Sequence, residues 1–406
     1  MEKSKPISRS ASFKKNTEYS TQLCRWFLKP IAGWPQMNDL NVAYGILGLL
    51  HVLICVTVVA LIMIPCTLFV LLEDANIKIK LGTIGPLIHR IIGTVNYWML
   101  LQHSNDIRNL IRHMESDWKI INRNQDRDVM MQHAKFGRFV AGMCGVIMHG
   151  GAFLFSIARA IKTVPVTVGN DTFRMHPMTC PLYSQIIDTR FSPVNEIALT
   201  VQFMSTFIVS SSTAGACSLA AVFAMHASGQ LNVLYTWLSE LEDNEKGGNS
   251  TEQKLAVIVE HHLRILSFVA RVENVMNKIS LIELMGCTIN MCLCGYYLIL
   301  AWDDFDATKI TSYINVYFSM GFNIFIFCYI GEIVTEQCKY VGEMAYMTNW
   351  YNLHHKTALG LVLIIVRSSN VIKFTAGKLF HLSIATFGDV IKTSMVYLNL
   401  LRTLTM

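Results

Sequence analysis

The residues with the clearest chemical potential lie in the last apolar segment of the chain, Leu379 to Leu401. Asp389 and Lys392 are three residues apart, so on a helix they share one face with Asn399 and Thr403. Charged groups inside a membrane are costly unless they are paired or hydrated. These two side chains therefore either form an ion pair between helices or face an aqueous path.

The end of the same segment combines leucines with small polar residues. Leu400, Leu401 and Leu404 are interleaved with Asn399 and Thr403. A ring of leucines beside a ring of small polar groups is what a hydrophobic gate with a weakly selective lining requires. The chemistry that this segment predicts is ion conduction rather than catalysis.

A second group of residues is suited to binding a small molecule. Aromatic and sulfur-bearing side chains gather in the middle apolar segments, in the halves expected to lie outward, where they could line an apolar pocket with a few hydroxyls. Ordinary packing is the alternative for any single aromatic residue. The candidate ligand-binding residues are Tyr97, Met148, Gly151, Phe155, Phe203, Phe207, Tyr313, Tyr317 and Met320.

The sequence contains no pattern typical of an enzyme or a metal protein. It has neither a phosphate-binding glycine loop nor a His-Glu zinc motif. Cys292 and Cys294 are two residues apart and point to different faces of a helix, which is poor geometry for zinc. The pairs His261-His262 and His354-His355 diverge in the same way, and we expect both to be partly solvated surface histidines. No enzymatic activity, cofactor or metal is predicted.

Composition places these residues in a membrane protein. The chain has 406 residues, of which 52% are hydrophobic and only 15% are charged, and its mean hydropathy is +0.38. An ordinary soluble domain is more polar than this. The net charge of +6 needs no nucleic-acid partner, because an excess of basic residues on the cytoplasmic side explains it.

Seven apolar segments are long enough to cross a bilayer, which takes about 20 residues each. The stretch Thr357 to Val366 is only about half as long and predicts a buried cytoplasmic helix before the last span. The fold class predicted is an all-α membrane protein with seven transmembrane helices, the last split into a short cytoplasmic part and a membrane part. The expected spans are residues 41–72, 82–101, 136–161, 193–227, 278–301, 313–334 and 379–401.

Lysine and arginine crowd into alternate connections, which predicts the orientation. The N-terminal tail and the second-to-third, fourth-to-fifth and sixth-to-seventh connections are rich in them, so the N-terminus is expected in the cytoplasm and the C-terminus outside. The sequon at Asn170 then lies outside and could be glycosylated. The other connections hold only Lys78, Lys80, Lys162, Arg174, Arg190 and Lys309.

This topology divides the chain into four parts. Residues 1–40 form a cytoplasmic tail and residues 41–337 form the first six helices with the pocket. Residues 338–377 form a cytoplasmic segment, and residues 378–406 form the last transmembrane helix.

The chain resembles insect odorant receptors along nearly its whole length, most specifically in its last third. The run GEMAYMTNWYNL, Gly342 to Leu353, resembles the family's cytoplasmic element A-Y-x-x-x-W-Y. The stretch Val366 to Leu404 resembles the family's ending, with Lys392-Thr393-Ser394 and then Tyr397.

The resemblance implies an odorant-gated, non-selective cation channel subunit that assembles, as a tetramer, with an olfactory co-receptor in the plasma membrane of sensory neuron dendrites. It implies that odorants bind in an outward-facing pocket among the second to sixth spans and that the last helix lines the pore. Carried onto this chain, the pore candidates are Asn399, Leu400, Thr403 and Leu404, and the candidates for the cytoplasmic anchor between subunits are Trp350 and Tyr351.

Three other classes are weighed against this one. A G-protein-coupled receptor predicts an external N-terminus, an external disulfide and an Asn-Pro pair in the last span. None of these is visible in the sequence, and Cys180 is the only cysteine in the expected external connections, so no disulfide can join two of them. A gustatory-type receptor channel predicts a Thr-Tyr…Gln-Phe signature where this chain has Val396-Tyr397 and Leu401-Arg402. A transporter predicts repeated halves. The short connection from Ser228 to Asn277 favours an odour-tuning subunit over a co-receptor.

Overall fold

The computed structural model describes residues 6–37, 42–168, 171–241, 251–303 and 305–405. Helices make up most of this part of the chain, and two short antiparallel hairpins, β1–β2 and β3–β4, complete it. The first half contains α1 (Pro6–Leu28), η1 (Lys29–Ile31), α2 (Val42–Leu72), α3 (Ile77–Gln102), α4 (Ser104–Ile120), α5 (Asn124–Ala160), β1 (Val164–Val168) and β2 (Asp171–Met175). The second half contains α6 (Val194–Ser239), α7 (Thr251–Asp303), α8 (Ala307–Met347), η2 (Trp350–Asn352), α9 (His355–Ser369), β3 (Thr375–Ala376), β4 (Phe380–His381) and α10 (Ile384–Thr405).

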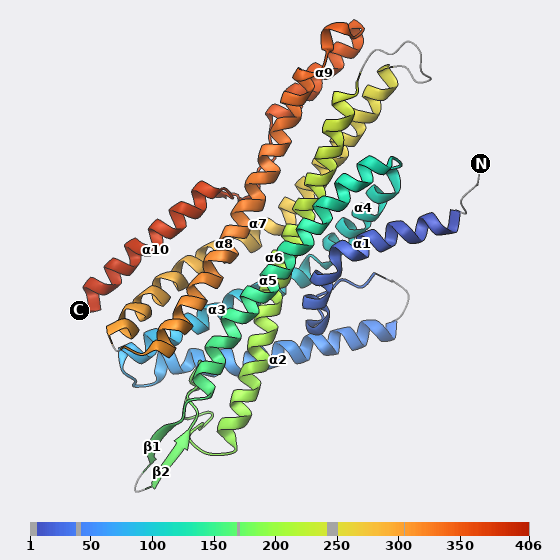
Figure 1. The fold of residues 1–406 in the computed structure, drawn as a ribbon. Helices are drawn as coiled ribbons and strands as arrows, with labels where there is room; N and C mark the ends of the chain where they lie inside the picture. Colours follow the sequence, from blue (N-terminus) through green and yellow to red (C-terminus); the bar gives the residue numbers. More distant parts are fainter. Residues whose placement is uncertain (1–5, 38–41, 169–170, 242–250, 304, 406) are drawn as a thin grey trace.

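Helix α6 is the centre of the molecule. It packs against α1, α2, α3, α5, α7 and α8, and 94% of its most apolar stretch is buried, against 17% for α2. Small residues along α6, namely alanine, serine and glycine, allow this close approach. The serine hydroxyls can also bond to backbone carbonyls of neighbouring helices, as Ser212 does to Gly93 O at 2.7 Å. Figure 1 shows the long helices α5 to α8 lying together, with the β1–β2 hairpin at one end and α9 at the other.

Every apolar segment expected to cross the membrane overlaps a helix, but the last helix begins at Ile384 and not at Leu379, because Phe380 and His381 belong to β4. Within the described part of the chain, α2, α5, α6, α7 and α8 are long and apolar enough to be candidate spans. The remaining two expected spans, α3 and α10, are more polar, as expected for helices that face protein or water on one side. The prediction of an all-α membrane-type fold is confirmed.

The helices extend beyond the membrane lengths that the apolar pattern predicted. Helix α7 begins at Thr251 and α8 continues to Met347, so both run on through segments that read as polar connections. Helix α4 was missed because its charged face hides an apolar stripe that includes Ile107, Leu110 and Trp118. The β1–β2 hairpin and helix α1 were not predicted either.

A buried charged cluster holds α4 against the extended parts of α6 and α7. Asp117 Oδ2 lies 2.8 Å from His226 Nε2, and its Oδ1 accepts a hydrogen bond from Arg264 Nε at 2.6 Å. Burial alone would raise the pKa of the Asp117 carboxyl, but the neighbouring His113 and His226 side chains lower it well below its usual range. Asp117 is therefore a carboxylate at neutral pH.

The prediction that His261 and His262 are partly solvated is wrong. Their exposures are 6% and 2%, because α7 continues as a helix that packs against α6 and α9 at this level. The His261 ring lies 4.7 Å from the Trp237 ring, centroid to centroid. His354 and His355 are exposed, as expected.

The β3–β4 hairpin separates α9 from α10 and fixes both to α7. The Gly377 N–H donates to Asn277 O at 2.8 Å, and the Thr375 N–H donates to the Glu273 carboxylate at 3.0 Å. Gly377 has a φ of 61°, and a Cβ there would lie 2.5 Å from Leu281 Cδ2, so the turn requires glycine. The expected helix Thr357–Val366 lies within α9.

Candidate functional site

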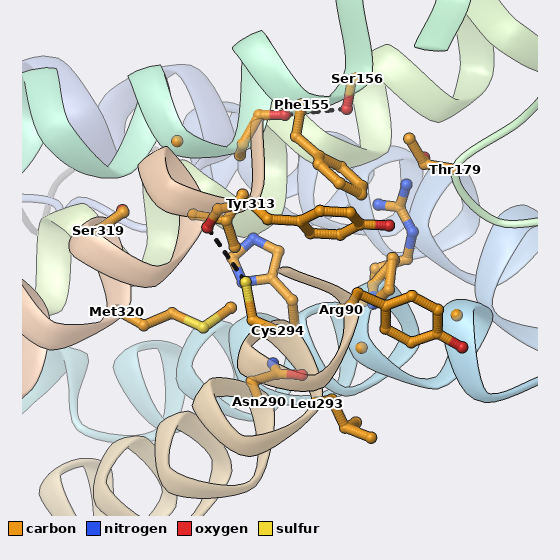
Figure 2. A pocket seen from close by; sticks show the side chains of 18 of the residues that line it. Arg90, Phe155, Ser156, Thr179, Asn290, Leu293, Cys294, Tyr313, Ser319 and Met320 are labelled. Carbon is orange, nitrogen blue, oxygen red and sulfur yellow. Dashed lines mark hydrogen bonds between the residues drawn. The ribbon is translucent and has the colours of Figure 1, made fainter. Parts of the chain in front are cut away.

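A cavity of about 110 Å³ lies among α3, α5, α7 and α8, and it is mostly apolar. Helix α3 contributes its Gly82–Arg90 stretch and α5 contributes its Met148–Ser156 stretch. Figure 2 shows the side chains of Phe155, Tyr313, Cys294, Asn290 and Met320 grouped around it. Its volume is comparable to that of a cavity that holds a benzene-sized molecule.

The close packing of α5 on α8 forms one wall of the cavity. A Cβ on Gly151 would lie 2.7 Å from Ser319 Cβ, so only glycine allows the two helices to approach this closely. The Ser319 hydroxyl donates to Ile147 O at 3.1 Å and fastens the contact. Both Gly151 and Ser319 line the cavity.

Aromatic rings form a second wall. The Tyr313 ring lies 5.8 Å from the Phe155 ring and 5.8 Å from the Tyr297 ring, at distances typical of favourable aromatic pairs. The Cys294 thiol donates to the Tyr313 carbonyl at 3.2 Å and ties α7 to α8 beside the cavity. These contacts fix the apolar surface that a ligand would meet.

Two polar groups in the wall lack hydrogen-bond partners. Asn290 is 2% exposed, and neither its amide oxygen nor its amide nitrogen has a partner within the described part of the chain. The Nε2 atom of His89 is likewise without one there. A buried amide without partners costs free energy, so a bound molecule with a polar group would be stabilised at this wall.

The structure brings together some of the predicted ligand-binding residues and separates the others. Met148, Gly151, Phe155, Tyr313 and Met320 line the cavity. The remaining four do not line it, because they pack within or between helices: Tyr97 donates to Ile31 O at 2.7 Å, Phe203 stacks on Phe153, Phe207 lies against His149, and Tyr317 packs against the core.

Several lining residues were not among the predicted ones. Arg90, Asn290, Cys294 and Tyr297 line the cavity alongside Thr179 from the loop before α6. The polar content of α3 gave a signal for Arg90, because a charged residue inside a span is a functional candidate. No signal in a single sequence placed Asn290 or Thr179 beside it, since that depends on which helix faces meet.

Helix α10 presents its polar face away from the rest of the chain. Lys392 Nζ lies 3.8 Å from Asp389 Oδ1, and the two side chains are 81% and 75% exposed. Of the two alternatives, an ion pair between helices is not what the chain forms, because the two residues pair within α10. Val390 and Ser394 form the opposite, buried face, and Phe387 meets Phe325 of α8 at 5.5 Å.

The predicted pore residues continue this exposed face. Asn399, Leu400 and Thr403 are all exposed, and the Thr403 hydroxyl donates to Asn399 O at 2.9 Å. Leu404 belongs to α10, but its side chain is outside the described ones.

The predicted anchor residues lie in η2, between α8 and α9. Trp350 and Tyr351 are 46% and 69% exposed, and their rings meet edge to face at 6.0 Å. Exposed aromatic rings of this kind are typical of contact surfaces. The glycosylation candidate Asn170 lies outside the described residues.

Helix α7 touches both the cavity and α10. Asn290, Leu293, Cys294 and Tyr297 line the cavity, while the Cβ position of Gly295 lies 3.3 Å from Leu398 Cδ2 of α10. One turn of a single helix therefore carries the cavity wall on one side and the α10 contact on the other.

Solved structures share this fold. The olfactory receptor OR5 from Machilis hrabei in complex with eugenol superposes with a TM-score of 0.73, at 14% identity, over 98% of this chain and 100% of that one. The same receptor in a second structure gives a TM-score of 0.72, at 16% identity, over 95% and 99% of the two chains.

Sequence relatives point to the same group of proteins. Odorant receptor 13a of Drosophila melanogaster is 24% identical over 50% of this chain and 53% of its own length. Odorant receptor 10 of Aedes albopictus is 23% identical over 53% and 57%. The chain spans about half the length of these relatives. The 7tm Odorant receptor family matches residues 80–395, which include the cavity and most of α10, and this multi-pass membrane protein therefore belongs to that family of receptors.

Proposed function

We propose that this chain is the odour-tuning subunit of an odorant-gated, non-selective cation channel, and that it works with an olfactory co-receptor in a hetero-oligomer, a tetramer. A small volatile molecule binds in the cavity among α3, α5, α7 and α8 and opens a pore lined by α10. The N-terminus is cytoplasmic, and the protein acts in the plasma membrane of sensory neuron dendrites. Its membership of the odorant receptor family supports the receptor part of this proposal.

The observation that carries the channel part is the exposed polar face of α10. A charged pair with side chains 81% and 75% exposed does not suit a lipid-facing surface in a helix expected to span the membrane. Water or other subunits must therefore meet Asp389 and Lys392. Four such helices around an axis would provide both, with Asn399, Leu400, Thr403 and Leu404 along the conducting path.

The connection between ligand and pore runs through α7. A ligand that contacts Asn290 and Cys294 bears on the same turn that touches Leu398 through Gly295. Opening follows if the ligand binds more tightly to the arrangement of α7 and α10 in the open state, because a ligand shifts an equilibrium only through such a difference in affinity.

The cytoplasmic ends hold the subunits together in this proposal. Trp350 and Tyr351 are exposed on η2, beside α9, where they are available to neighbouring subunits. The external sequon at Asn170 is a proposed glycosylation site.

The experiment that tests the proposal is a whole-cell recording from cells that express this chain with and without an olfactory co-receptor, during application of a broad odorant panel. A rapid cation current that requires both chains and persists under a G-protein blocker is expected. A blocker-sensitive signal from this chain alone would contradict the channel and support a metabotropic receptor. A current evoked by tastants and not by volatiles would support a gustatory-type channel.

A further inference from the structure

Arg90 is a buried charge at the cavity wall. Its side chain is 3% exposed, it lines the cavity, and Figure 2 shows its guanidinium directed toward the side chains of Phe155, Tyr313 and Thr179. Its guanidinium always carries a positive charge. A charge in this position requires either a counter-ion or a ligand that supplies one.

The groups that hold Arg90 are neutral hydroxyls and a thiol. Its Nη1 donates to Ser205 Oγ and Thr206 Oγ1 at 3.3 Å, its Nη2 to Thr206 Oγ1 at 3.2 Å, and its Nε to Cys180 Sγ at 3.2 Å. Within the described part of the chain no carboxylate bonds to it. These contacts leave one of the five guanidinium N–H groups, on Nη2, for a further acceptor.

A second cavity lies beside the first, near the β1–β2 end of α5 and the start of α8. It measures about 210 Å³ and shares Phe155 and Tyr313 with the first. Its other side chains include Arg159, Lys162 and Lys309. We call this second cavity the basic vestibule.

Ion pairs and a ring contact hold the basic side chains of the vestibule. Asp306 pairs with Lys162 at 3.2 Å and with Lys309 at 3.4 Å, while the Arg159 guanidinium lies over the Phe155 ring at 5.2 Å. The charged side chains that line this cavity, Arg159, Lys162 and Lys309, are all basic, and a hollow lined by one sign of charge concentrates ions of the opposite sign. Basic side chains thus lie both at the wall of the apolar main cavity and in the cavity next to it.

We propose that the cavity selects small carboxylic acids, that the ligand carboxylate binds Arg90, and that the acid's hydrocarbon part fills the apolar space among Phe155, Tyr313 and Met320. This proposal rests on the cavity being the odorant site of the proposed function. An Arg-carboxylate pair is among the strongest hydrogen-bonded contacts in proteins, and here it also neutralises a buried charge. The unpartnered Asn290 amide adds a further polar group for the same ligand.

Cys180 is the competitor for the Arg90 charge. A hydrogen bond with the Cys66 thiol and the neighbouring Arg90 and Arg159 charges lower the pKa of the Cys180 thiol below its ordinary value, although burial raises it. A Cys180 thiolate would neutralise Arg90 without a ligand. The protonation state of Cys180 therefore decides which ligand the cavity prefers. A Cys180 thiol leaves Arg90 to bind an acid, whereas a Cys180 thiolate would favour a neutral odorant.

The test compares straight-chain carboxylic acids with the primary alcohols and methyl esters of the same chain length, on this chain co-expressed with its co-receptor. The half-maximal concentration for the best acid should be at least about tenfold below those of its alcohol and ester, because a charge-assisted bond is lost in both. Equal potencies of acid, alcohol and ester would overturn the proposal while leaving the odorant-gated channel intact.

Variants locate the effect at Arg90. Arg90→Gln should abolish the preference for the acid, Arg90→Lys should keep part of it, and Cys180→Ser should leave it in place. Arg174→Gln is the matched control, because Arg174 is an exposed arginine on β2 that lines neither cavity. An acid preference that survives in Arg90→Gln at normal surface expression would contradict the assignment. If Arg90→Gln does not reach the surface, Arg90→Lys and the ligand series on the natural chain decide the matter.

A binding measurement separates this proposal from the channel itself. Thermal unfolding of the purified complex should shift upward with the acid at concentrations where the alcohol has no effect. A shift without any current would keep the ligand class and refute the channel. A current evoked only by neutral odorants, with no shift from acids, would refute the ligand class alone.

Discussion

Gly295 of α7 faces Leu398 of α10 so closely that a Cβ added at Gly295 would lie 3.3 Å from Leu398 Cδ2. The preceding residue, Cys294, donates its thiol hydrogen to Tyr313 O at 3.2 Å in the cavity wall. Two neighbouring residues on one helix thus touch the ligand cavity and the helix that we propose lines the pore. A movement of this turn would therefore change the packing on both sides.

The first prediction concerns this contact. Gly295→Val should force Leu398 and α10 outward, because its branched side chain needs space that Leu398 occupies. We expect a changed resting current or a several-fold shift in the half-maximal odorant concentration, with the order of odorant potencies preserved. Gly295→Ala is the control, since the end of the flexible Leu398 side chain can move to admit one methyl group.

Whole-cell dose–response curves at matched surface expression measure this effect. Identical curves for Gly295→Val and the natural chain would show that the α7–α10 contact does not take part in gating.

The second prediction concerns the wall of the cavity between α5 and α8. Gly151→Ala should reduce odorant-evoked current strongly, because the new Cβ would lie 2.7 Å from Ser319 Cβ and would force the helices apart. Gly150→Ala is a matched control, since a Cβ at Gly150 has nothing within 4 Å. Odorant-evoked current, normalised to protein at the cell surface, should fall for Gly151→Ala and stay normal for Gly150→Ala. Equal responses would contradict the role of this contact in shaping the cavity.

The sequence predicted some of the residues that line this cavity and not others, because residue type alone does not show which face of a helix a side chain lies on. Met148, Gly151 and Phe155 were predicted from the composition of one apolar segment, and they do line the cavity. Tyr97 and Phe203 have the same composition signal but turn to other helices. Which face of a helix meets which neighbour depends on packing over the whole bundle. The periodicity of a single segment cannot predict that neighbour.

The fold was more predictable than the site. Apolar length alone placed the spans, because a bilayer requires about 20 apolar residues per helix. The continuations of α7 and α8 beyond the expected spans were missed because they pack on other helices, and their buried apolar residues, such as Ile258, Ile265 and Val341, are interspersed with charged ones. The buried His261 and His262 belong to the same missed region.

The third prediction concerns the buried charged cluster around Asp117, between α4, α6 and α7. Asp117→Asn should destabilise the protein by roughly 3 kcal/mol, because it leaves the buried His226 and the Arg264 guanidinium without their carboxylate. Asp188→Asn is the control, because Asp188 forms an exposed pair with Arg190 and its loss should not be measurable.

Thermal unfolding of the purified protein measures both variants and also the effect of pH. The pKa of Asp117 is lowered in the folded state, so its stabilisation is present above the ordinary carboxyl range and is lost as the pH falls. Asp117→Asn should therefore be less sensitive to acid than the natural chain. Equal stability of Asp117→Asn and the natural chain at neutral pH would contradict the importance of the cluster.

The most direct test of the central claim, that the exposed face of α10 lines a conducting pore, is the accessibility of a cysteine at Leu400. The native cysteines within the described part of the chain are all buried, whereas Leu400 is 56% exposed, so a positively charged thiol reagent should attack Leu400→Cys selectively. The measurement is the odorant-evoked current of Leu400→Cys, expressed with the co-receptor, before and after the reagent. We predict an irreversible block that develops faster while odorant holds the channel open, and no block of the natural chain. A current that is unchanged although the introduced cysteine is labelled would contradict a pore along α10.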